Sequence, residues 1–265
     1  MSSLSVIGDS KLEQIARPWW PIWAGMHWGF RRHSCVLWCA NGQIPAVQAW
    51  KVLGVDTFHP IEIVLFYREL VCELTPEKEL ASQIVEAMPV GERKHLKRFF
   101  AGPQAFEAAR SRQSIAFLMN EVFRSNHLPT LRESDDTGRI ADGRRFAEGL
   151  RRTRVMQSDN APADQSKVPL IFIAESCPEL IKTLPSLEYD EKNQEDTKEV
   201  GNEQDSIWEA AKTCYRECPS VAGGLPRHIK RQQFIDKGIT MQQRYLNAIE
   251  FDRKNSRPQR IVKRR

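Results

Sequence analysis

Two acidic residues one helical turn apart form the first candidate site in this sequence. Asp205 and Glu209 occupy positions i and i+4 of a predicted helix, "DSIWEAAKTCYREC", so their carboxylates would lie on one helix face. Hard divalent cations bind carboxylate oxygens, and this pair could hold one metal ion together with water molecules. Glu69, on a predicted strand that ends in "YREL", is the candidate for a third ligand.

Each of these acids also has a purely structural interpretation. Asp205 could interact with the positive end of the helix dipole, as acids in a first helical turn commonly do. Glu209 could be a solvated helix residue, and Glu69 could pair with a nearby arginine.

His27 lies in "GMHWGF", the first half of a predicted pair of strands. Many phosphodiester-cutting enzymes have an aspartate at this place, just before an aromatic residue and a glycine. A histidine offers one neutral nitrogen and cannot bridge two magnesium ions. The alternative is a hydrogen-bonded histidine of the core.

The elements that position these residues alternate between strands and helices. Four apolar, β-rich runs come first, and two amphipathic helices follow with a short strand between them. A buried strand, "VPLIFIAES", then precedes two more helices. We expect the central strands to include 22–30 and 170–174, and we expect "AVQAWKVLGV" to be a strand and Thr75 to cap the helix that follows Pro76. This order predicts an α/β domain with a mixed sheet.

The composition is that of a globular protein, and its cysteine usage indicates a reducing compartment. Of its 265 residues 41% are hydrophobic and 28% charged, and no apolar run approaches the roughly 20 residues that span a bilayer. The N-terminus lacks the layout of a secretory signal, so we expect a cytoplasmic protein without a membrane partner. Six cysteines without a dense pattern predict reduced, buried thiols; the pairs Cys35/Cys39 and Cys214/Cys218 lack a second suitably spaced pair for zinc.

The C-terminal segment is strongly basic. From Arg227 to the end there are twelve basic and three acidic side chains, a net charge of +9, whereas the whole chain has +5. The rest of the chain is therefore near −4. Such a tail predicts a nucleic-acid contact or a docking segment, or serves solubility alone. The candidate DNA-contacting residues are Arg227, Lys230, Arg231, Lys263, Arg264 and Arg265.

Six motifs, in this order, resemble those of the C-terminal nuclease domain of the phage terminase large subunit, the DNA-packaging motor. The resemblance covers about three quarters of the chain, from Trp20 to Tyr215. The ATPase domain that precedes this nuclease in the family has no counterpart, since no Gly-rich phosphate loop occurs in the sequence. The motifs are "GMHWGF", "FYRELVCELTPEKELASQI", "FFAGPQAFEAARSRQSIA", "GRIADGRRFAEGL", "LIFIAESCPELIKTLPSLEYD" and "DSIWEAA".

This resemblance implies a ribonuclease H-like fold and metal-assisted hydrolysis of DNA with Mg²⁺ or Mn²⁺. The family's first-strand aspartate falls on His27, and the aspartate of its Asp-Pro turn falls on Gly102. The aspartate heading the last helix is retained as Asp205, and the second acid of that motif is Glu209. The implied catalytic residues are Asp205, Glu209 and His27, and the metal ligands are Asp205, Glu209 and Glu69. With two family acids replaced, the acidic site is degenerate.

Three functional hypotheses follow from the resemblance. The first is an active or weakly active nuclease that cuts double-stranded DNA. The second is a catalytically silent nuclease-fold module that binds DNA or docks on a packaging partner. The third is a gene remnant or a split subunit whose ATPase half is a separate chain. Implied partners are double-stranded DNA and a packaging ATPase, a portal or a small terminase subunit. We expect an N-terminal arm at 1–18, the nuclease domain at 19–218 and the basic tail at 219–265. His27, Gly102, Asp205 and Glu209 should converge at one edge of the sheet.

Overall fold

The computed structural model describes the main part of the chain. Described residues are 5–8, 10–11, 20–29, 33–53, 60–107, 113–134, 139–151, 154–155, 167–188, 197 and 203–218. The chain divides into two units, Met1–Val221 and Ala222–Arg265, and every described residue belongs to the first. The predicted DNA-contacting residues of the tail, Arg227 to Arg265, lie outside the described residues.

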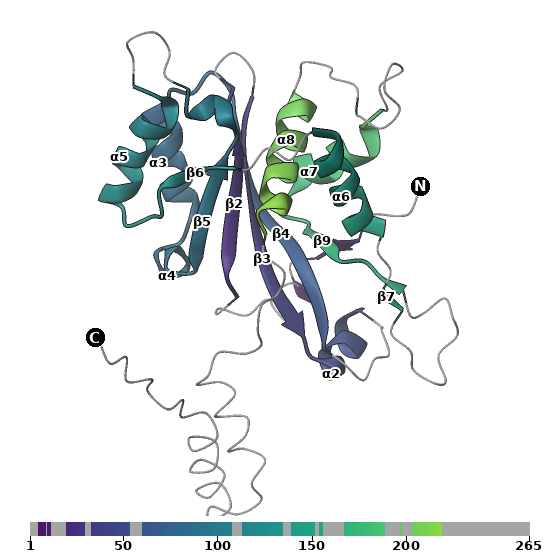
Figure 1. Ribbon diagram of the computed structural model, residues 1–265. Coiled ribbons are helices and arrows are strands. Elements are labelled where there is room, and N and C mark those ends of the chain that lie inside the picture. Colours follow the sequence, from purple (N-terminus) through teal and green to yellow (C-terminus); the bar gives the residue numbers. More distant parts are fainter. Residues whose placement is uncertain are drawn as a thin grey trace, which may run out of the picture. The chain divides into compact units, whose positions relative to one another are not determined.

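A mixed seven-stranded sheet forms the centre of the first unit (Figure 1). Its strand order is β1-β9-β4-β3-β2-β5-β6. Strand β3 is antiparallel to both of its neighbours, β2 and β4, whereas β5 and β6 continue parallel to β2, and β9 and β1 parallel to β4. The expected mixed α/β sheet is confirmed. The bounds are β1 Val6–Ile7, β2 Ile22–His27, β3 Ser34–Ile44, β4 Ile61–Cys72, β5 Leu96–Ala101, β6 Leu131–Glu133 and β9 Ile171–Ala174.

Helices cover both faces of this sheet (Figure 1). Helices α3 (Glu77–Ala87) and α5 (Ile115–Ser125) pack on one face. On the other lie α6 (Arg139–Arg151), α7 (Pro178–Ser186) and α8 (Glu203–Arg216). The short elements are α2 Ala46–Gln48, the π-helix η1 Ala49–Leu53, α4 Val90–Arg93, the 3-10 helix η2 Pro103–Ala105 and the paired strands β7 Arg154–Val155 and β8 Lys167–Val168. None of the described helices has both the length and the apolar character needed to cross a membrane.

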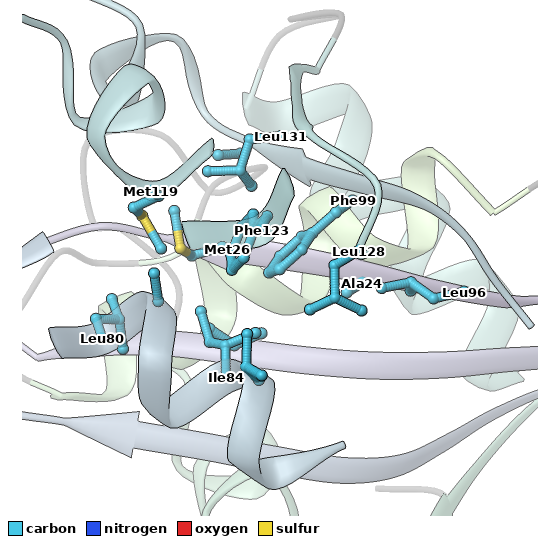
Figure 2. Close-up of a cluster of buried hydrophobic side chains, with 14 of the residues drawn as sticks. Ala24, Met26, Leu80, Ile84, Leu96, Phe99, Met119, Phe123, Leu128 and Leu131 are labelled. Atoms are coloured by element: carbon cyan, nitrogen blue, oxygen red, sulfur yellow. The ribbon is translucent and has the colours of Figure 1, made fainter. Parts of the chain in front are cut away.

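The core under α3 and α5 is aliphatic and aromatic, without an ionisable group among its labelled members (Figure 2). Leu80 and Ile84 of α3 and Met119 and Phe123 of α5 are fully buried against the sheet. Phe123 stacks on Phe99 of β5 with ring centroids 5.4 Å apart. Burying a side chain of this size contributes about 1.5–3 kcal/mol, so this face stabilises the strands that end at the candidate site.

The core under α8 differs from the core under α3 and α5 because it contains cysteine thiols and aromatic rings packed edge to face. Phe146 of α6 meets both Trp208 and Tyr215 of α8 edge to face. Cys39 and Cys214 are fully buried, with their sulfur atoms 3.1 Å apart. All six cysteines are free thiols, and five of them are buried, as the sequence predicted.

Three local expectations were wrong or incomplete. The run after β3 is helical (α2 and η1) instead of a strand, because Pro45 lacks the N–H needed to continue the ladder and instead starts a helix. Pro76 takes the N-cap position of α3, while the hydroxyl of Thr75 donates to the carbonyl of Glu73. Strand β9 is second from the edge, since Val6–Ile7, inside the expected N-terminal arm, adds β1 beside it.

Candidate functional site

The carboxyl ends of β2 and β5 bring His27 and Gly102 to the same edge of the sheet. These strands are parallel neighbours, with Gly25 opposite Phe100 and Met26 opposite Ala101. Gly102 follows Ala101 directly, as His27 follows Met26. Parallel strands in open α/β sheets carry ligand sites at such ends. The structure thus places two of the predicted positions at one edge, without an acid at either.

His27 and Glu69 lie on the sheet face that α8 covers. His27 pairs with Cys35, and Leu37, two residues further along β3, pairs with Glu69. Cross-strand partners project to the same face, as do alternate residues of one strand. Cys35 and Leu37 are fully buried in the core under α8, which fixes the side of the sheet.

Helix α8 starts near this edge and runs back along β2. Its C-terminal half contacts the middle of the sheet, where the Cys214 thiol donates to the carbonyl of Leu37 at 3.5 Å. Its N-terminal turn lies toward the strand ends, since the helix leads back from Cys214, which meets Gly25 of β2, toward Cys35 and Glu69; burial chiefly raises the pKa of both groups, and the charge of Glu203 contributes to the shift. The first turn of α8, with Glu203 and Asp205, is therefore on the side of the sheet edge where His27 lies.

Glu203 is a functional candidate that the sequence analysis missed. It lies one helical turn before the fully buried Ile207, on the stripe of α8 that faces the sheet. Asp205 is two positions on, about 200° around the helix, and so projects elsewhere. The signal was present in the spacing of Glu203, Ile207, Ala210 and Cys214, whose last three members are fully buried.

Glu69 binds the start of helix α7. Its two carboxylate oxygens accept hydrogen bonds from the backbone N–H groups of Glu179, at 2.7 Å, and Leu180, at 3.0 Å. Burial raises the pKa of Glu69 and outweighs these hydrogen bonds, which lower it; the charges of Glu179 and Glu203 raise it further. The carboxylate thus satisfies two amides that a helix start leaves without partners.

Glu209 neutralises a buried cation. Its carboxylate accepts a hydrogen bond of 2.8 Å from the ammonium of Lys212, a side chain only 3% exposed. The same ammonium lies 5.4 Å from the centre of the Trp208 ring. Asp205 is half-buried in the first turn of α8, where its charge also suits the helix dipole.

These residues do not fit a pair of divalent cations. Within the described part of the chain, no group of three or more His, Cys, Asp or Glu side chains is arranged to hold a metal ion. The side chain of His27 offers a nitrogen and Gly102 has no side chain, whereas Mg²⁺ binds oxygen ligands in octahedral geometry, typically one or two carboxylates together with water molecules. Glu69 and Glu209 are already engaged by α7 and by Lys212.

Comparisons with known proteins identify the fold. A large terminase from a thermophilic bacteriophage superposes with a TM-score of 0.50 at 13% sequence identity, over 80% of this chain and 41% of that one. The P22 large terminase nuclease domain gives 0.43 at 8% identity, over 77% and 87% of the two chains. The large terminase nuclease of thermophilic phage G20c, with bound cobalt, gives 0.39 at 7% identity, over 77% and 84%. No family model and no curated protein matches the sequence.

The large terminase of the thermophilic bacteriophage is the structural neighbour with a TM-score of 0.50. It confirms the ribonuclease H-like α/β fold that the sequence motifs implied. This chain spans about two fifths of that large terminase's length. At 13% identity the likeness establishes the fold and leaves activity, substrate and partners to be proposed.

Proposed function

We propose that this chain is a nuclease-fold module of a phage DNA-packaging machine that binds duplex DNA and cleaves it slowly or not at all. The observation that carries the proposal is the chemistry at the ends of β2 and β5. The resembled family has an aspartate at each of these ends, and this chain has His27 and Gly102.

The loss of these acids acts directly on metal affinity. Carboxylates neutralise the charge of a hard cation, and a two-metal site needs one of them to bridge both ions. A neutral imidazole and a glycine cannot replace that charge. The contacts of Glu69 with α7 and of Glu209 with Lys212 further support a module whose acids serve the fold.

Residual cleavage with Mg²⁺ or Mn²⁺ is the second candidate function. It is favoured by the first turn of α8, which lies on the side of the sheet edge where His27 lies and contains Glu203 and Asp205, although only Glu203 is on the stripe that faces the sheet. In either case the chain would act in the host cytoplasm. A packaging ATPase, a portal or a small terminase subunit is the expected partner, as the resemblance to a packaging-motor nuclease implies.

A plasmid-nicking assay combined with a binding assay tests the proposal. We expect the full chain to shift a short DNA duplex, and to leave supercoiled plasmid intact or nick it slowly with Mg²⁺ or Mn²⁺. Rapid nicking that Asp205→Ala abolishes would establish an active nuclease and overturn the silent module. Rapid nicking that survives in Asp205→Ala would refute the assignment of Asp205. Absence of any DNA binding would refute the module itself.

The tail has its own test. The charge of +9 between Arg227 and Arg265, on a chain otherwise near −4, predicts that the tail contributes most of the DNA affinity. Truncation after Leu225 should then weaken duplex binding strongly in anisotropy titrations at two salt concentrations. Unchanged affinity would mean that the first unit holds the DNA.

A further inference from the structure

We propose that Arg98 and Arg132, at the β5–β6 side of the sheet, form a phosphate-binding track that holds the backbone of duplex DNA and leads it to the His27–Gly102 edge. The inference rests on the proposed DNA-binding function and assigns part of it to named residues of the first unit. Both arginines lie on the face of the sheet that α8 covers, as the strand register shows.

Register places both arginines on the face that carries His27. Arg98 pairs with Trp23, and Arg132 pairs with Phe100, which in turn pairs with Gly25. Trp23 and Phe100 belong to the core under α8, so their cross-strand partners project to that side. Arg98 and Arg132 are offset by one strand and two residues, which corresponds to about 8 Å between their Cα atoms.

Both arginines are exposed, although the aromatic residues beside them are buried. Trp23 and Phe100 are each only 5% exposed, whereas Arg98 and Arg132 reach solvent. Neither arginine has an ion-pair partner among the residues that the structure describes. Arg216 of α8 is different, because Asp142 and Ser134 engage its guanidinium. Two exposed cations without an ion-pair partner among the described residues therefore lie beside the buried core under α8.

Further cations enhance the positive potential where β5 begins. Residues 93–98 include Arg93, Lys94, Lys97 and Arg98 and no acid. His95, within this stretch, has its pKa lowered by burial and by the charges of Lys94 and Lys97. A polyanion approaching this side of the sheet would meet an attractive field, although the first unit as a whole is not basic.

The chemistry and the direction of the track both suit a DNA backbone. A guanidinium binds phosphate oxygens with two parallel hydrogen bonds, and such contacts position a duplex without reading its sequence. Arg132 is level with Phe100, so Gly102 is two residues, or roughly 7 Å, further along β5. A DNA strand held by both arginines would reach the edge where a nuclease of this fold acts.

The test compares two charge-matched double variants of the full chain. In Arg98→Gln/Arg132→Gln the track is neutralised. In Lys51→Gln/Arg124→Gln, two exposed cations outside the track, one in η1 and one in α5, are neutralised, so the net charge changes identically. Anisotropy titrations of a short duplex between about 50 and 200 mM salt measure how many phosphates each protein neutralises. Because every variant keeps the tail, its contribution cancels.

We expect the log–log salt slope of the track variant to be shallower by about 1.8, from about 0.9 for each of two phosphates. The loss of affinity over this fourfold salt range would then be about 12-fold smaller than in the wild type. The control should keep the wild-type slope. Arg98→Lys/Arg132→Lys should also keep it, because charge is retained, and so separates lost contacts from damaged folding.

Two outcomes overturn the track. A wild-type slope in the Arg98→Gln/Arg132→Gln protein would show that these residues contact no phosphate, and an equal change in the control would show a non-specific charge effect. Either result leaves DNA binding itself intact. Failure of the wild type to bind duplex would instead refute the proposed function, so the two failures are distinguishable.

Discussion

Replacement of Gly25 by alanine tests the contact on which the site depends, that between β2 and α8. A Cβ atom at this position would lie 2.4 Å from the backbone nitrogen of Cys214 and 2.6 Å from its Cα. Ordinary contact begins at 3.4 Å, so α8 would have to retreat by about 1.0 Å. The obstructing atoms are backbone, so rotation of a side chain cannot relieve the clash.

We expect Gly25→Ala to lower the free energy of unfolding by about 3 kcal/mol, the upper part of the range for overpacked cores. For a domain of this size the melting temperature should fall by roughly 6–12 °C. Urea denaturation followed by circular dichroism, together with a thermal melt, measures both quantities.

Gly91→Ala is the matched control. No atom lies within 4 Å of a Cβ at position 91, and the residue is in helix α4, so alanine should stabilise the protein by about 0.5–1 kcal/mol. Gly25→Ala should lower the free energy of unfolding by a similar amount in a Cys214→Ala background, because the clash is with the backbone of residue 214. A Gly25→Ala protein within about 0.5 kcal/mol of the wild type would refute the close approach of α8.

Three further predictions concern the acids. Burial raises the pKa of Glu69 above its ordinary value of 4.5 in the folded state, so its contribution to stability is full below pH 4.5 and declines as the pH rises through the folded pKa. Wild type should therefore lose stability relative to Glu69→Gln as the pH rises from 4.5 through the folded pKa, and a constant difference in urea unfolding would contradict this. Glu209→Ala leaves the ammonium of Lys212 buried without its carboxylate and should cost about 1–3 kcal/mol, while Glu209→Gln, which keeps an acceptor, should cost less; equal denaturation midpoints would argue against the pair. Restoring His27→Asp with Gly102→Asp should increase magnesium-dependent plasmid nicking over the wild type and over His27→Asn/Gly102→Asn, and tight magnesium binding by the unmodified protein in calorimetry would count against a degenerate site.

Much of the sheet could be predicted because local pattern and long-range packing agree there. The apolar runs around Met26, Phe66 and Phe99 are strands in the structure, and the helical spacing of Met119 and Phe123 is indeed buried. The run after β3 was mistaken for a strand because its apolar residues fit either structure. Pro45, which ends the ladder, decided the outcome.

The arrangement of the site was harder to predict than its elements. Glu203 was missed because its relation to Glu69 depends on which face of α8 packs on the sheet, a property of the tertiary structure. Likewise, Cys39 and Cys214 are 175 residues apart, and no spacing rule relates them. Glu69 caps α7, whose first residues are 110 positions later in the chain, so its backbone partners could not be inferred from "YREL".

The position of α8 in the chain has a consequence for biosynthesis. Ile22 and Glu203 are 181 positions apart, yet α8 covers the strand that Ile22 begins. At roughly 5 to 20 residues per second, a ribosome needs about 10 to 40 s to make the chain between them. During that interval the nascent sheet would expose Trp23, Leu37 and Phe66 on its uncovered face. Those residues are natural contacts for a chaperone, and the yield of folded protein should depend on how well the ribosome-bound intermediate is shielded until α8 emerges.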